Sequence, residues 1–119
     1  MSAVITNEYG SIHIESDVIA KIAGYAAMDC YGIVGMAAKN VRDGLVQLLK
    51  MESFTKGVRI TMDDGCIGID LHIIVEYGTN INAISESLAE TVKYRAEEQT
   101  GLPVASVNVF VEGVRVDRG

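Results

Sequence analysis

Long apolar runs are missing from this 119-residue sequence. No run approaches the about 20 residues that a helix needs to cross a bilayer. The first ten residues, MSAVITNEYG, lack the basic region and the apolar core of a secretory leader. We therefore expect a cytoplasmic protein that does not insert into a membrane by itself.

Basic residues are also scarce. Ten Lys and Arg side chains stand against sixteen Asp and Glu, which gives a formal net charge of −6. Proteins that bind a phosphate backbone or an anionic bilayer draw their affinity from concentrated Lys and Arg. The balance of charge argues against nucleic acid as a partner and against direct binding to an anionic membrane.

Only two cysteines are present, Cys30 and Cys66, and they fit no paired framework. In a chain without a leader segment, two isolated thiols indicate a reduced, intracellular protein. The sequence leaves open whether these two residues can form a disulfide.

Motifs that carry chemistry are absent from the sequence. It has no His-x-x-x-His or Cys-x-x-Cys pair for a metal, no Gly-x-Ser-x-Gly elbow and no Gly-Lys-Ser or Gly-Lys-Thr phosphate loop. Asp63-Asp64-Gly65 lacks the alternating ligands of a calcium loop and predicts a turn instead. We expect no enzyme: no catalytic residue, no cofactor and no resident metal.

What the sequence does contain is a β-hairpin at residues 57–77. Apolar residues alternate with polar ones from Val58 to Met62 and again from Ile67 to Val75. The turn residues Asp64-Gly65 separate the two runs, and Gly accepts the positive φ of a tight turn. One face of the second strand is branched aliphatic, so the rest of the chain must cover it.

The remaining pattern predicts one domain over residues 1–119, with residues 1–9 as a loose lead-in. The expected elements are a strand at 10–14, a helix from an N-cap at Ser16 to about Cys30, a short strand at 32–36, a helix at 44–51, a connector at 52–56, a helix from 81 to Gly101, and a last strand at 107–116 with a bulge at Gly113. The fold class is α+β: a two-layer sandwich with a mostly antiparallel sheet built on the central hairpin and two long helices on one face.

A candidate surface lies on the sheet face opposite the helices. Asp70 and His72 point to that face, as do two apolar residues, Ile74 and Phe110. Apolar side chains on an open sheet face can mark an interface, or neighbouring Lys and Glu stems can cover them. His13, Asn108 and Glu112 could add to a metal site there, although a solvated polar face explains the same residues. A second candidate for docking is the predicted helix 44–51, through Leu45 and Leu49.

The sequence resembles the alkaline-shock and general-stress family of Gram-positive bacteria, and is most similar to its YloU-like branch. The resemblance covers nearly the whole chain. It is carried by Gly10-x-Ile12-x-Ile14, Ile19-Ala20-Lys21-Ile22-Ala23, Asp29-Cys30-Tyr31-Gly32-Ile33-Val34-Gly35-Met36-Ala37, Lys39-Asn40 with Asp43-Gly44-Leu45, Ile73-Ile74-Val75-x-Tyr77-Gly78, and Ser106-Val107-Asn108-Val109-x-Val111-x-Gly113-Val114-Arg115-Val116.

The resemblance implies a small cytoplasmic protein linked to cell-envelope stress, with no established catalytic residue. Some members are held at the membrane by a separate anchor protein. The first hypothesis is therefore a non-catalytic protein that acts through self-association or protein partners. The alternative is a regulator that binds a small ligand or metal near Asp70 and His72. That alternative draws on the likeness to proteins encoded beside a fatty-acid kinase, which hints at lipid metabolism.

Overall fold

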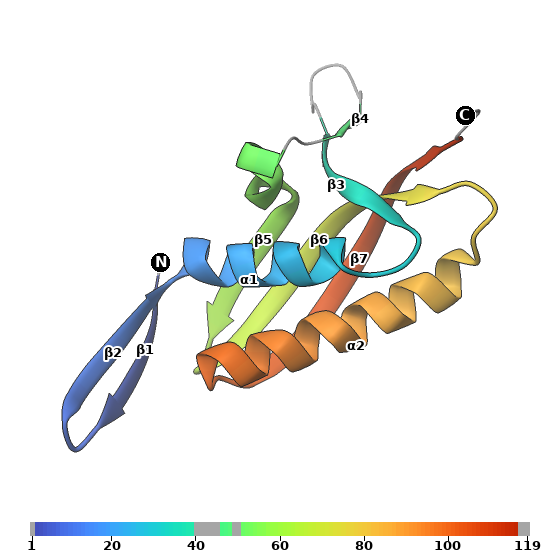
Figure 1. Ribbon diagram of the computed structural model, residues 1–119. Helices are drawn as coiled ribbons and strands as arrows, with labels where there is room; N and C mark the ends of the chain where they lie inside the picture. The colour runs from blue at the N-terminus through green and yellow to red at the C-terminus, as the bar shows by residue number, and fades with distance from the viewer. Residues whose placement is uncertain (1, 40–45, 49–50, 117–119) are drawn as a thin grey trace.

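A computed structural model describes residues 2–39, 46–48 and 51–116. Two helices lie on one face of a five-stranded sheet, and a separate two-stranded hairpin extends from the body (Figure 1). The elements in chain order are β1 (Ser2–Asn7), β2 (Gly10–Glu15), α1 (Ser16–Met28), β3 (Ile33–Lys39), β4 (Val46–Leu48), the 3-10 helix η1 (Met51–Gly57), β5 (Val58–Asp63), β6 (Cys66–Glu76), α2 (Ile81–Thr100) and β7 (Val104–Arg115). The predicted α+β sandwich is confirmed.

Strand β6 is the centre of the sheet and pairs with three other strands. β5 pairs with residues 66–71 of β6 and β3 with residues 73–75, both antiparallel. β7 runs parallel along nearly all of β6, so β5 and β3 must share the opposite edge. The parallel pair is possible because α2 carries the chain back across the sheet between β6 and β7. The helix-facing residues of β6 form the middle of the core and are fully buried: Ile67, Ile69, Leu71, Ile73 and Val75.

The hairpin turn and the ends of α2 follow the sequence closely. Asp64 and Gly65 have φ of 50° and 77°, as a two-residue turn between twisted strands requires. Asn80 caps α2 because its Oδ1 accepts a hydrogen bond of 3.0 Å from the amide of Ala83. Gly101 ends the helix at φ 73°, and its amide donates to the carbonyl of Glu97. These predictions are confirmed.

Two other predictions are wrong. The lead-in predicted as loose at residues 1–9 is ordered over residues 2–9, because β1 pairs with β2 in register from Ser2 opposite Glu15 to Asn7 opposite Gly10. Residues 46–48 form strand β4 against β3, where a helix over 44–51 was predicted. A helix of eight residues has little stability of its own, and the open edge of β3 offers backbone hydrogen bonds instead. Gly44, Leu45, Leu49 and Lys50 lie outside the described residues.

The helix α1 also differs slightly from its prediction. Its N-cap position is Glu15 and not Ser16, without a side-chain cap, and the helix ends at Met28. The many small residues of α1 still have the expected effect, because they let neighbouring elements approach closely. A Cβ on Gly24 would overlap Cε2 of Phe54, so only glycine fits there.

Phe54 anchors the connector between β4 and β5. Its side chain is 5% exposed, and its ring centre lies 4.8 Å from that of Tyr25 on α1, at 57°. The predicted connector is therefore a 3-10 helix that inserts an aromatic ring into the core above Gly24.

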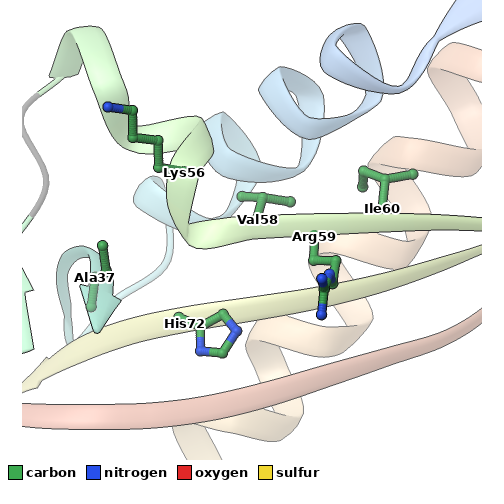
Figure 2. A pocket seen from close by; sticks show the side chains of 7 residues that line it. Ala37, Lys56, Val58, Arg59, Ile60 and His72 are labelled. Atoms are coloured by element: carbon green, nitrogen blue, oxygen red, sulfur yellow. The ribbon is translucent and has the colours of Figure 1, made fainter. Parts of the chain in front are cut away.

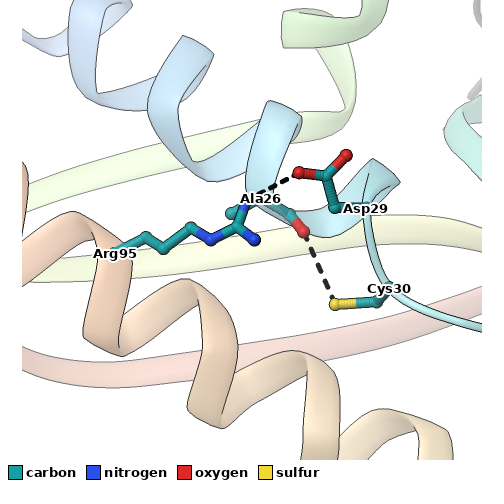
Figure 3. Close-up of polar contacts among 4 residues, drawn as sticks. All are labelled: Ala26, Asp29, Cys30 and Arg95. Carbon is teal, nitrogen blue, oxygen red and sulfur yellow. Dashed lines mark hydrogen bonds and ion pairs between the residues drawn. The ribbon is translucent and has the colours of Figure 1, made fainter.

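One ion pair joins the two helices at the end of α1 (Figure 3). Arg95 Nη1 donates to Asp29 Oδ2 at 2.8 Å, and this hydrogen bond raises the pKa of Arg95. Next to it, Cys30 Sγ donates to the carbonyl of Ala26 at 3.4 Å.

The two cysteines cannot form an intramolecular disulfide in this fold. Ile33, three residues after Cys30, pairs with Val75, whereas Cys66 begins β6 at its other end. The nine residues between those positions span roughly 30 Å of strand. A disulfide needs Cα atoms within about 7 Å. Both thiols are free, and the question that the sequence left open is answered.

Candidate binding surface on the open face of the sheet

The open face of the sheet carries two stacked rows of side chains from β6 and β7. Strand alternation points Asp70 and His72 away from the helices, and the register sets them opposite Asn108 and Phe110. Asn108 Nδ2 donates to Asp70 Oδ1 at 3.0 Å. The rings of His72 and Phe110 stack with centres 4.8 Å apart and 13° between their planes. The sequence therefore brings Asp70, His72 and Phe110 together as predicted.

Glu112 completes this group because of a bulge. Ile73 lies opposite Val111 and Ile74 opposite Gly113, so Glu112 is an extra residue in β7. Its Oε1 lies 2.8 Å from Nδ1 of His72. A carboxylate only accepts hydrogen bonds, so we assign the proton to Nδ1, which makes Nε2 the acceptor nitrogen of the ring. We call Asp70, His72, Asn108, Phe110 and Glu112 the open-face patch.

The apolar part of the patch is Phe110 alone. Phe110 exposes 44% of its surface, whereas Ile74 exposes 9%. The prediction that Ile74 forms an exposed apolar pair with Phe110 is wrong, because Ile74 is buried, with Gly35 of β3 and Gly113 of β7 as its register partners. Leu45 and Leu49, the other predicted docking residues, lie outside the described part of the chain.

A metal site is not supported by the side chains that the structure describes. His13 lies on β2, in the separate sheet, where its Nε2 and Ser11 Oγ are 3.0 Å apart. It does not join His72, contrary to the prediction. Within residues 2–39, 46–48 and 51–116, no three His, Cys, Asp or Glu side chains come together as metal ligands.

A hollow of about 570 Å³ opens beside His72 (Figure 2). β5 leaves the edge of β6 at Leu71 and β3 joins it at Ile73, so His72 lies where neither strand pairs. Arg59 points to the opposite side of β5 from Val58 and Ile60 (Figure 2). The hollow thus has two cationic groups and a mostly apolar remainder, lined by Ala37, Ala38, Lys56, Val58, Arg59, Ile60 and His72.

The sequence reasoning missed Arg59 and Lys56. The hairpin turn was a usable signal for Arg59, because counting back from Asp64-Gly65 sets Arg59 opposite Asp70. No comparable signal exists for Lys56, since the hollow depends on β3 and β5 sharing one edge of β6.

Comparison with known proteins identifies the family. A model of the alkaline-shock protein family, described as having a cell envelope-related function, matches residues 4–116. The chain belongs to the alkaline-shock protein family. It is 48% identical to the uncharacterized protein YloU of Bacillus subtilis, over 98% of both chains. The resemblance to the alkaline-shock family and its YloU-like branch is confirmed.

More distant relatives include a protein named for a stress response. The chain is 36% identical to the uncharacterized protein Spy1614 of Streptococcus pyogenes, over 98% of this chain and 97% of that protein. It is 29% identical to a stress response regulator gls24 homolog of the same species, over 89% of this chain and 59% of that longer protein. The alkaline-shock-family chain is thus related to proteins of envelope and stress responses.

A solved structure shares the fold. The chain titled MamM CTD H264E superposes with a TM-score of 0.50 over 87% of this chain and 96% of that one, at 14% identity. At this identity the likeness concerns the fold alone. Among the described helices, none is long and apolar enough to cross a bilayer.

Proposed function

We propose that this alkaline-shock-family protein is a non-catalytic binding protein of the cell-envelope stress response, acting through self-association or through protein partners. Family membership supports the envelope context. The chemistry of the open-face patch supports binding. His72 is oriented by Glu112, yet no Ser, Thr or Cys of the described residues forms a hydrogen bond with its ring. An oriented histidine without a nucleophile beside it lacks the nucleophile–base pair of covalent catalysis.

Phe110 is the observation that carries the proposal. Its ring is 44% exposed, stacked on His72, and surrounded by the polar side chains of Asp70, Asn108 and Glu112. An aromatic side chain with a polar rim is typical of the residues that dominate interface energies. Because the stack already orders the ring, little side-chain entropy is lost on binding. Any recruitment to the membrane would then be indirect, through a membrane-anchored partner that docks here.

Phe110→Asp tests this proposal. Loss of an aromatic anchor typically costs at least about 2 kcal/mol, so we expect partner capture or self-association to weaken more than about ten-fold. The measurement is affinity capture from a Gram-positive lysate, with the captured partner then titrated as a purified protein. Tyr9→Asp is the matched control, because Tyr9 is 91% exposed at the tip of the β1–β2 hairpin. Equal binding by both variants would place the interface elsewhere. A strict monomer without any partner would contradict the proposal.

A second candidate function is a lipid-linked ligand regulator, and the hollow beside His72 favours it. Arg59 and Lys56 line the hollow with cationic groups, and the partly buried Val58 and Ile60 line it with apolar atoms. That combination suits an amphiphilic anion such as a fatty acid or an acyl phosphate.

Native mass spectrometry with a medium-chain fatty acid tests the ligand hypothesis. We expect a one-to-one complex and a rise in melting temperature, both weakened several-fold in Arg59→Ala, because the carboxylate loses its charged donor. Lys21→Ala, on the exposed side of α1, is the control. The purified protein is also analysed for bound metal, because the same hypothesis includes a metal as the ligand. If no fatty acid or metal is bound and the melting temperature does not change, the ligand hypothesis is wrong.

A further inference from the structure

We propose that the outer edge of β7 pairs antiparallel with β7 of a second copy of this chain, joining two sheets into one. The inference rests on the proposed binding function and names its partner at this edge. A two-fold axis through Val109, perpendicular to the sheet, relates the two copies and keeps all helices on the same side.

The edge of β7 is long and unprotected. β7 has twelve residues and pairs with β6 on one side, and no other described strand pairs with its outer side. Natural edge strands are usually short or carry charges, Lys or Pro that prevent pairing. Residues 106–111 contain none of these, and the two bulges of β7, at Ala105 and Glu112, lie on either side of them. The opposite edge strand, β5, has six residues and carries Arg59 and Asp63. The two edges therefore differ, and β7 is the one open to pairing.

Apolar surface remains uncovered beside this edge. Val107, Val109 and Val111 face the helices, as their partners Ile69, Leu71 and Ile73 do, yet they are only partly buried. The partners on β6 are fully buried. The helix layer of one chain therefore does not fully cover its last strand. A second copy placed against the edge would cover these valine side chains.

The side chains of β7 complement themselves in one register. With Val109 at the two-fold axis, Val107 lies opposite Val111 on the helix side, and Asn108 lies opposite Phe110 on the open face. Ser106 then faces Glu112, so no two charges are opposed. If the axis passes through Phe110 instead, each side chain still faces the same side of the sheet. Val107 then lies opposite Gly113 and Asn108 opposite Glu112, so one valine pair is lost. The pattern therefore favours the axis at Val109.

The exposed side of α2 supplies complementary charge at the same axis. Glu86, Ala89 and Lys93 lie at i, i+3 and i+7, so they share one stripe of the helix, opposite Arg95, which contacts α1. Val109 is five residues from the start of β7, which is roughly 16 Å along the strand. Ala89 lies at roughly the same distance from the C-terminal end of α2, measured along the helix axis. Two antiparallel α2 helices centred there bring Glu86 opposite Lys93 of the second copy. The small Ala89 permits their close approach.

Charge reversal on α2 tests the dimer without touching the core. Sedimentation velocity of the full chain should show a concentration-dependent dimer. Lys93→Glu should weaken the dimer several-fold, because Glu86 of the other copy then faces a like charge. Adding Glu86→Lys should restore it, since the exchanged charges attract again. A rescue of this kind is expected only when one copy meets another.

A cross-link tests the register. In a chain whose Cys30 and Cys66 are changed to Ser, Val109→Cys should form a covalent dimer on mild oxidation, because the two Cβ atoms meet at the axis. Thr61→Cys, exposed on the opposite edge strand, should not. A monomer at all concentrations overturns the inference, as does cross-linking of both variants alike. If a monomer still captures a partner through Phe110, this inference fails while the proposed function stands.

Discussion

Replacing Leu71 by alanine should lower the free energy of unfolding by about 2–5 kcal/mol, because the change removes three carbons from a fully packed site. Leu71 is completely buried in the middle of β6, between Val58 of β5 and Val109 of β7. Neighbouring strands on both sides fix the backbone there, so the cavity cannot close by a local shift. A loss of this size is a large fraction of the about 5–15 kcal/mol that stabilises a typical domain.

Urea denaturation followed by circular dichroism measures the effect of Leu71→Ala. Val4→Ala is the control, because Val4 is 50% exposed on the β1–β2 hairpin and should change stability by less than about 0.5 kcal/mol. A loss below about 1 kcal/mol for Leu71→Ala would show that β6 is not the centre of the core.

Phe54→Ala is expected to cost about 3–5 kcal/mol, the usual range for truncating a buried aromatic ring. Phe54 is the buried side chain by which the segment between β4 and β5 contacts α1, and its ring fills the space above Gly24. Truncation therefore removes both the apolar burial and the contact with Tyr25. The same urea titration measures the change.

Phe54→Leu gives the matched control for this second prediction. Leucine keeps most of the apolar volume, so its cost should be clearly smaller than that of alanine. If both substitutions leave the denaturation midpoint unchanged, Phe54 does not anchor the connector in solution.

The sequence was sufficient for the elements whose local signals agree with their packing. In the 57–77 hairpin, the alternation and the Asp64-Gly65 turn both require the same register. The signals for α2 also agree with one another: the helix begins after the Asn80 cap, its apolar stripe faces the sheet, and it ends at Gly101. The two helices then had to cover the aliphatic face of β6, which yields the two-layer fold.

The errors lie where distant parts of the chain decide the local structure. The apolar residues of 44–51 suit a helix by spacing, but the edge of β3 pairs with 46–48 as a strand. The lead-in residues form a strand because β2 lies next to them in a tight hairpin. Neither partner is visible in the spacing of the segment itself.

The candidate surface was predicted in part. Alternation alone puts Asp70 and His72 on one face, and the last strand adds Phe110 when it pairs beside β6. The reach of Glu112 to His72 depends on a bulge in β7, and the hollow near Arg59 depends on β3 and β5 sharing one edge of β6. Those features follow from tertiary register, which the pattern of a single strand does not determine.

We propose that the protein works by binding through β7 and the open-face patch. Hydrogen exchange, measured by mass spectrometry on the free protein and on its complex with a captured partner or a second copy, tests it most directly. We expect added protection in β7, over residues 106–112, and unchanged exchange at the tip of the β1–β2 hairpin. Added protection confined to that hairpin, with β7 unchanged, would contradict it.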